Sequence, residues 1–159
     1  MSARTRVARA AARSTSRLPK RLLRRMAGDP LEIDGNTLDL QMQAFAAAAT
    51  KRGGGQEPTP EAVRDAFTEM VQITQHEPVA TVSTHDRTIP GPAGDLAVRI
   101  YHPTRTSGAA PAIVWYHQGG YVIGDLDTDH ALCTTLADRC GAVVVSVDYR
   151  QAPEHPLTL

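Results

Sequence analysis

The residues best suited to chemistry form the segment His117-Gln118-Gly119-Gly120, directly after the apolar run Ala112–Tyr116. Consecutive glycines leave backbone N–H groups unshielded. After a strand, they stand at the carboxyl edge of a sheet, where ligands bind in open α/β folds. Two N–H groups aimed at one point can stabilise an oxyanion. The alternative is that these glycines only make a tight turn, so the segment by itself leaves both interpretations open.

A second patterned segment lies at residues 145–156 and reads Val-Ser-Val-Asp-Tyr-Arg-Gln-Ala-Pro-Glu-His-Pro. Together with the stretch 117–129, which reads His-Gln-Gly-Gly-Tyr and then Gly-Asp-Leu-Asp-Thr-Asp, it resembles the hormone-sensitive-lipase-like carboxylesterases and lipases, the bacterial family IV type of the α/β-hydrolase fold. The resemblance covers residues from about 80 to 157. It implies hydrolysis of short- to medium-chain carboxylic esters through an acyl-serine intermediate.

The resemblance also implies roles for individual residues. Gly119 and Gly120 correspond to the glycines that donate N–H groups to the tetrahedral oxyanion. His117 corresponds to a histidine that braces the loop and is not the catalytic base. Three charged residues are implied to form a structural network below the site: Asp148, Arg150 and Glu154. Within it, Asp148 and Arg150 can form a charge-assisted pair. The family implies no cofactor.

Three positions depart from the family pattern. Gln118 replaces the first glycine of the usual triplet, so the loop is expected to lose a positive-φ conformation there. Asp129-His130 reverses the usual His-Asp order, and Gln151 stands where a leucine is usual. The amide of Gln151 would lie near the core, and an unpaired buried amide costs about 1 kcal/mol or more.

The nucleophile motif Gly-x-Ser-x-Gly does not occur in the sequence. In the family, Ser, acid and His all follow the Asp-Tyr-Arg segment, and the sequence stops at Leu159, where residues 157–159 already leave the family pattern. We therefore expect an amino-terminal fragment that supplies the oxyanion loop, lacks the Ser-Asp-His triad and is inactive alone. Its incomplete sheet would leave strand 112–116 with an open edge, which predicts instability or aggregation.

Several alternatives remain open at this stage. A second polypeptide can complement the missing triad in trans, in which case a small ester is the substrate. The chain can instead be a non-enzymatic binding protein that uses its basic arm, or the product of a pseudogene. A complementing chain or an oligomer is thus among the expected partners.

Charge is unevenly distributed, although the net charge is zero. The first 25 residues hold 9 of the 17 Lys and Arg residues and no acid, so the remainder carries 8 cations against 17 acids. A globally basic nucleic-acid binder is excluded, and no nucleic-acid partner is expected. Residues 1–25 can be a transit peptide, a basic helix that makes weak contacts with an anionic surface, or a solvated extension that docks on the acidic body.

No apolar run approaches the roughly 18 residues that span a bilayer. The two cysteines, Cys133 and Cys140, cannot form a disulfide framework and favour a reducing compartment. A cytoplasmic location is therefore expected. Their spacing places both on one helix face and predicts packing rather than redox chemistry.

Three acids have the spacing that opens a calcium loop: Asp125, Asp127 and Asp129. The sixth position of such a loop would be His130 instead of glycine, and the twelfth would be Leu136 instead of glutamate. Acids at a helix start explain the pattern better, because they favour the positive end of the helix dipole. No metal site is expected.

The elements that must position the glycine loop form a βαβ unit. Continuous runs of β-branched and apolar residues at 112–116 and 142–147 suit parallel strands that are buried on both faces. A crossover helix is predicted over Thr128 to Arg139, with Asp127 or Thr128 as its cap and Gly141 past its end. Alternating patterns at residues 79–89 and 96–101 flank a turn cluster and predict an antiparallel hairpin.

The residues before the hairpin are predicted to be helical. The helices are expected at residues 3–26, broken near Pro19; from Leu38 to about Lys51, capped by Asn36 or Thr37; and from Pro60 to before Pro78, capped by Thr59. The predicted fold is thus the amino-terminal half of an α/β hydrolase, with helical cap segments, an antiparallel hairpin, one parallel βαβ unit and an incomplete sheet. Its predicted parts are a basic helical extension at 1–27, helical cap segments at 28–78 and a truncated core at 79–159.

Overall fold

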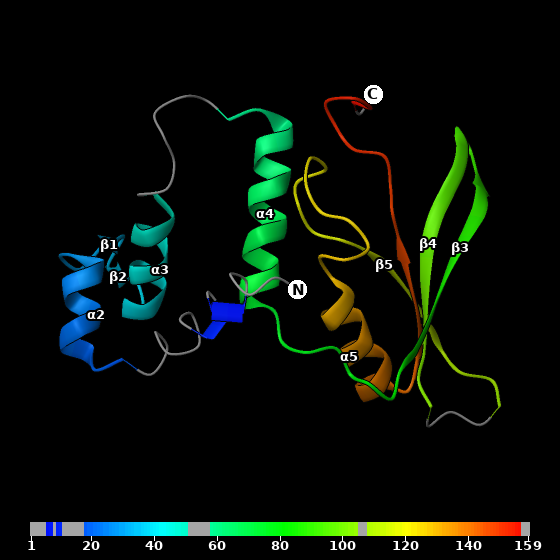
Figure 1. The fold of residues 1–159 in the computed structure, drawn as a ribbon, viewed down its shortest axis with the longest axis horizontal. Coiled ribbons are helices and arrows are strands. Elements are labelled where there is room, and N and C mark those ends of the chain that lie inside the picture. The colour runs from blue at the N-terminus through cyan, green and yellow to red at the C-terminus, as the bar shows by residue number, and fades with distance from the viewer. Residues whose placement is uncertain (1–5, 8, 11–17, 51–57, 105–107, 157–159) are drawn as a thin grey trace. The chain divides into compact units, whose positions relative to one another are not determined.

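A computed structural model describes residues 6–7, 9–10, 18–50, 58–104 and 108–156 (Figure 1). Its internal contacts divide the chain into two compact units, residues 1–58 and residues 59–159. Residues 1–5, 8 and 11–17, about half of the predicted basic extension, lie outside the described residues. No helix in the described part of the chain is long and apolar enough to cross a membrane.

The first unit includes, among its described elements, two helices and a short hairpin. Its elements are α2 (Lys20–Ala27), β1 (Glu32–Ile33), β2 (Asn36–Thr37) and α3 (Leu40–Thr50). Asp34-Gly35 forms the turn of this hairpin, and the residues on either side of it pair as strands. The cap prediction for α3 is therefore wrong: Asn36 and Thr37 lie in β2, and the Asp39 carboxylate accepts from the backbone N–H groups of Gln41 and Met42.

The second unit begins with helix α4 (Pro60–Thr74), whose start confirms the prediction. Pro60 occupies the first helical position, and the Thr59 hydroxyl accepts from the N–H of Ala62 at 3.3 Å. Proline suits this position because its missing N–H would have no helical partner there. The helix ends at Thr74, before Pro78, as predicted.

A four-stranded sheet with a crossover helix forms the rest of this unit. The elements are β3 (Ser83–Gly91), β4 (Gly94–His102), β5 (Ala112–Tyr116), α5 (His130–Cys140) and β6 (Val143–Val147). The strand order is β3-β4-β6-β5, with β5 parallel to β6 and the other pairs antiparallel. The predicted hairpin and βαβ unit are therefore confirmed.

Helix α5 starts later than predicted. Asp127 and Thr128 do not cap it; instead the Asp125 carboxylate accepts from the N–H groups of Asp127 and Thr128 and closes a turn before the helix. Gly141 ends α5 in the left-handed conformation, as predicted. Its N–H donates to the Ala137 carbonyl, which satisfies one of the last helical acceptors.

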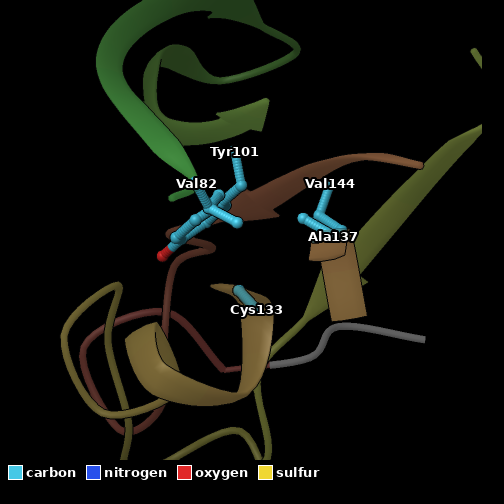
Figure 2. Packing of buried hydrophobic residues seen from close by; sticks show 5 residues of the cluster. All are labelled: Val82, Tyr101, Cys133, Ala137 and Val144. Atoms are coloured by element: carbon cyan, nitrogen blue, oxygen red, sulfur yellow. The ribbon is translucent and has the colours of Figure 1, made fainter. Parts of the chain in front are cut away.

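The core lies where α5 packs on one face of the sheet (Figure 2). Its buried residues come from the segment before β3 and from β4, α5 and β6: Val82, Tyr101, Cys133, Ala137 and Val144. Ile113 and Trp115 of β5 pack against this cluster. Burial raises the pKa of the Tyr101 phenol above its ordinary range.

Strand β5 forms one edge of the sheet and is not buried on both faces as predicted. Val114 is 56% exposed and Tyr116 is 65% exposed, whereas the alternate residues face α5. The apolar run fits a central parallel strand, but in the described residues only β6 pairs with it. The open edge that the sequence predicted is therefore present in the structure.

Candidate active-site loop

The loop after β5 is wound tightly around its glycines. Gly119 has φ +133° and Gly120 has φ +60°, and the next residue, Tyr121, also has a positive φ of 63°. The Gly119 carbonyl accepts from the N–H groups of Val122 and Ile123, each at 3.1 Å. A Cβ on Gly119 would lie 1.8 Å from the Ile123 carbonyl oxygen, so only glycine fits there.

Two adjacent backbone donors remain available in this loop. Among the described residues, no protein acceptor takes the N–H of Gly119 or of Gly120. Gly120 is exposed, and no atom lies within 4 Å of the position that its Cβ would occupy. Gln118 is not among the positive-φ residues, so the loop has no left-handed conformation where glutamine replaces the usual glycine, as expected.

His117 is buried beneath the loop, with only 3% of its surface exposed. Its Nδ1 lies 3.0 Å from the Gln118 carbonyl oxygen, and its ring stacks on Tyr149 with centroids 4.2 Å apart. The Tyr149 hydroxyl donates to the His117 carbonyl at 2.7 Å. Burial raises the pKa of Tyr149, which keeps this donor protonated. Tyr149 belongs to the second sequence motif, but sequence reasoning gave it no role.

The segment after β6 is bonded directly to the loop. The Gln151 side-chain Nε2 donates to the Gly124 carbonyl at 2.5 Å, and the Ala152 N–H donates to the Tyr121 carbonyl at 2.8 Å. The amide of Gln151 is therefore paired, which offsets the burial cost expected for it. The two sequence motifs meet through these bonds.

The predicted pairing of Asp148 with Arg150 is not present among the described residues. Arg150 is exposed, and burial raises the pKa of Asp148. Glu154 instead pairs with Arg64 of α4: Nη1 lies 2.8 Å from Oε1 and Nη2 lies 2.7 Å from Oε2. A guanidinium fork matches both carboxylate oxygens at once, which makes Arg64 the stronger partner. This pairing lowers the pKa of Glu154 to about 2.

Arg64 also contacts the loop itself, and sequence reasoning missed it. Its Nε donates to the Val122 carbonyl at 2.8 Å and its Nη2 to the Ala152 carbonyl at 2.9 Å. Figure 1 shows α4 beside the loop that follows β5. An arginine on an amphipathic helix is normally interpreted as a solvent-exposed residue. The sequence feature that could have indicated its role is Glu154, whose carboxylate needs a cationic partner.

The far end of the loop is anchored on α5 and the hairpin. The Trp115 indole Nε1 donates to the buried Asp129 carboxylate at 2.8 Å. In the reversed Asp129-His130 pair, Asp129 thus binds Trp115, while the His130 Nδ1 lies 3.3 Å from the Tyr101 hydroxyl. Burial lowers the pKa of His130.

Arg99 of β4 joins the hairpin to the turn before α5. It makes two bonds to the Asp86 carboxylate, at 2.6 and 3.0 Å, and one to Asp127 at 2.6 Å. The hydrogen bonds from Arg99 lower the pKa of Asp86. Within the described ranges no group of three or more His, Cys, Asp or Glu residues could hold a metal ion, and Asp125, Asp127 and Asp129 serve in turns and in the Trp115 contact.

This arrangement can hold an oxyanion, but the described part of the site contains no activated nucleophile. Ser146 lies in β6 and is fully buried, so its hydroxyl is not accessible to an ester. Ser83 lies on β3 and is exposed. His117 is held by Tyr149, and no hydrogen bond in the described structure joins it to the hydroxyl of either serine.

Comparison with known proteins agrees with the fold. A family model described as "alpha/beta hydrolase fold" matches residues 113–159. Carboxylic ester hydrolase LipN of Mycobacterium tuberculosis is 39% identical over 139 residues, which cover 86% of this chain and 36% of LipN. Esterase LipI of the same organism is 43% identical over 98 residues, 60% of this chain and 30% of LipI. The chain thus spans about a third of the length of these relatives.

Solved structures give the same result. A hyperthermophilic esterase from the archaeon Pyrobaculum calidifontis is 42% identical with a TM-score of 0.57, over 62% of this chain and 32% of that chain. The ester-hydrolase EH1AB1 from the metagenome of Lake Arreo is 32% identical with a TM-score of 0.63, over 71% and 37%. With its sheet order, its glycine loop and these matches, the chain has part of the α/β-hydrolase fold and resembles the hormone-sensitive-lipase-like carboxylic ester hydrolases.

Proposed function

We propose that this chain supplies the oxyanion-stabilising loop of a serine carboxylic ester hydrolase that acts on small esters. The observation that carries the proposal is the pair of adjacent N–H groups at Gly119 and Gly120, which have no acceptor among the described residues. In acyl transfer, such donors stabilise the charge that develops on the carbonyl oxygen. Losing one donor costs about 10²- to 10³-fold in kcat.

We infer that His117 braces this loop and that Glu154 supports it through Arg64. The stacking of His117 on Tyr149 and the bond to its carbonyl favour the first role. The bonds from Arg64 to Val122 and Glu154 favour the second. We assign no pairing role to Arg150.

A polypeptide of these 159 residues is not expected to hydrolyse esters by itself. The sequence contains no Gly-x-Ser-x-Gly segment, and therefore no nucleophile elbow from which an acyl-serine could form. The oxyanion donors alone provide charge stabilisation without a group that attacks the ester.

The open edge of β5 favours complementation in trans as a second candidate function. Val114 and Tyr116 are exposed on this strand, and its outer edge has unpaired backbone groups in the described structure. A second chain that adds a parallel strand there would bring a nucleophile to the same sheet edge as the loop.

Turnover of p-nitrophenyl butyrate tests both proposals. The purified chain is assayed alone and after mixing with a second polypeptide that carries Gly-Asp-Ser-Ala-Gly and the downstream Asp and His. We expect turnover only in the mixture, and its loss when Gly119 and Gly120 are changed to proline. Gly28→Ala is the matched control, because Gly28 also has a positive φ but lies in the other unit.

Two results would contradict these proposals. Turnover by the 159-residue chain alone, abolished by the two proline changes, would show that a nucleophile is present after all. Turnover of the mixture that survives those changes would remove Gly119 and Gly120 from the reaction.

The free thiols of Cys133 and Cys140 are the feature that supports a cytoplasmic location.

A further inference from the structure

Arg64 joins three segments that lie far apart in the sequence. From α4 it donates to the Val122 carbonyl in the glycine loop, to the Ala152 carbonyl after β6, and to both oxygens of the Glu154 carboxylate. We infer that Arg64 is a positioning residue that sets the conformation of the oxyanion loop. This inference rests on the proposed function only for what the loop does.

The contact pattern requires an arginine. Nε reaches the loop, Nη1 reaches Glu154, and Nη2 reaches both Glu154 and the Ala152 carbonyl. Five N–H groups in a rigid plane can serve acceptors in several directions, whereas a lysine ammonium is a single point. An arginine that only neutralised a charge would need no bond other than the one to Glu154. The additional bonds to the Val122 and Ala152 carbonyls therefore indicate a geometric role.

These bonds act on the backbone that shapes the oxyanion donors. Val122 is the residue whose N–H donates to the Gly119 carbonyl. Its own carbonyl is held by Arg64, and the preceding carbonyl, that of Tyr121, is held by the Ala152 N–H. The Tyr121–Val122 and Val122–Ile123 peptide groups are therefore tied to Ala152 and Arg64. Substituting Arg64 removes the hydrogen bond to the Val122 carbonyl. It also weakens the bond from the Ala152 N–H to the Tyr121 carbonyl, because Ala152 is itself held through its carbonyl by Arg64.

The positioning role makes α4 part of the support for the site, although it precedes the sheet in the chain. Arg64 is only 28% exposed, so solvent competes for these bonds less than at an open surface. Deleting residues 1–58, the other unit, should leave the loop intact. Deleting α4 as well should release it.

Hydrogen exchange in the 159-residue chain tests the inference without requiring turnover. The reporters are the N–H groups of Val122, Ile123 and Ala152, which are bonded to loop carbonyls. In Arg64→Ala we expect all three to exchange about tenfold faster or more, as expected for local opening, while β4 and α5 are unchanged. Arg64→Lys is the decisive variant, because it keeps the charge for Glu154. In it we expect Val122 and Ile123 to lose protection.

Arg99→Lys is the matched control, since Arg99 also pairs with carboxylates in the same unit but makes no bond to Val122 or Ala152. It should leave the three reporters unchanged. Full rescue of the reporters by Arg64→Lys would reduce Arg64 to a charge partner and overturn the inference. If Arg64→Ala unfolds the chain, Arg64→Lys still decides, because its Glu154 pair remains.

Turnover of the complemented mixture separates this inference from the proposed function. If Arg64 positions the donors, Arg64→Lys lowers kcat at least about tenfold while KM changes little, because only transition-state stabilisation is lost. If hydrogen exchange and kcat are both unchanged in Arg64→Lys, only the positioning role of Arg64 is overturned. Normal turnover after both glycines are changed to proline overturns the proposed function, whatever Arg64 does.

Discussion

The Tyr149 side chain contacts its neighbour His117 through both its ring and its hydroxyl. The two rings stack with an interplanar angle of 14°, and the Tyr149 hydroxyl donates to the His117 carbonyl at 2.7 Å. His117 is the first residue after β5, and its own Nδ1 faces the Gln118 carbonyl. Tyr149 thus connects the segment after β6 to the first peptide groups of the glycine loop.

We predict that Tyr149→Phe lowers the free energy of unfolding by about 1 kcal/mol, because the His117 carbonyl loses its donor while the stacking remains. Tyr149→Ala should cost at least about 1 kcal/mol more, since the ring pair is lost as well. Urea denaturation measures both. Tyr116→Phe is the control, because Tyr116 is 65% exposed. Equal stability of Tyr149→Phe and the parent chain would show that this bond contributes nothing.

The two loop glycines should respond very differently to alanine. Gly119→Ala places a Cβ 1.8 Å from the Ile123 carbonyl oxygen at φ +133°, so the loop must rearrange and stability should fall by more than about 2 kcal/mol. Gly120→Ala meets no atom within 4 Å at φ +60° and should cost only about 1 kcal/mol. Urea midpoints of the two variants check this, and a larger loss at Gly120 would contradict the loop geometry.

Much of the core could be predicted because its patterns are local. The alternation in Leu96–Tyr101 marks a half-buried strand, and the run of β-branched residues at 143–147 marks a buried one. Thr59-Pro60 starts a helix through interactions within one turn. The glycine loop could be placed because it directly follows a recognisable strand.

The rest depends on contacts that no local pattern contains. Arg64 and Glu154 are 90 residues apart, and nothing near either one identifies its partner. Strands of two residues beside Asp34-Gly35 are too short to show a period. The prediction that Val114 is buried was wrong for a related reason. The residue types of a strand indicate which environment suits it, but they do not show which strands lie beside it.

Stability should depend on pH through Glu154. Arg64 lowers the folded-state pKa of Glu154 to about 2 from 4.5, so the pair stabilises the fold above pH 4.5. This contribution is lost progressively as the pH falls from 4.5 toward 2. Glu154→Gln should lack it, so the difference in urea midpoint between parent and variant should shrink over that range. The comparison cancels Asp86 and Asp148, which both proteins share. A constant difference from pH 6 to 2.5 would contradict the pairing.

The open edge of β5 predicts self-association. A lysine on an edge strand opposes pairing with another strand, because its charge must stay in water. Val114→Lys should therefore shift the chain toward monomer in sedimentation velocity at a fixed concentration. Leu132→Lys is the control, because Leu132 is also exposed, at 38%, but lies on α5 and not on the edge strand. A parent chain that is already monomeric, or an equal effect of both variants, would argue against association through β5.

The two cysteines of α5 should differ in reactivity, which tests whether the helix stays on the sheet. Cys133 has no exposed surface, and burial raises the pKa of its thiol to about 11, so almost no thiolate is available at neutral pH. Cys140, at the last position of the helix, is exposed, so the packing predicted from its spacing with Cys133 is wrong for this residue. With Ellman's reagent in native buffer, we expect one thiol per chain to react quickly and the second only in denaturant. Cys140→Ser should abolish the fast phase. Two thiols that react together in native buffer would mean that α5 leaves the core formed with Tyr101 and Val144, and that the sheet alone does not hold this helix.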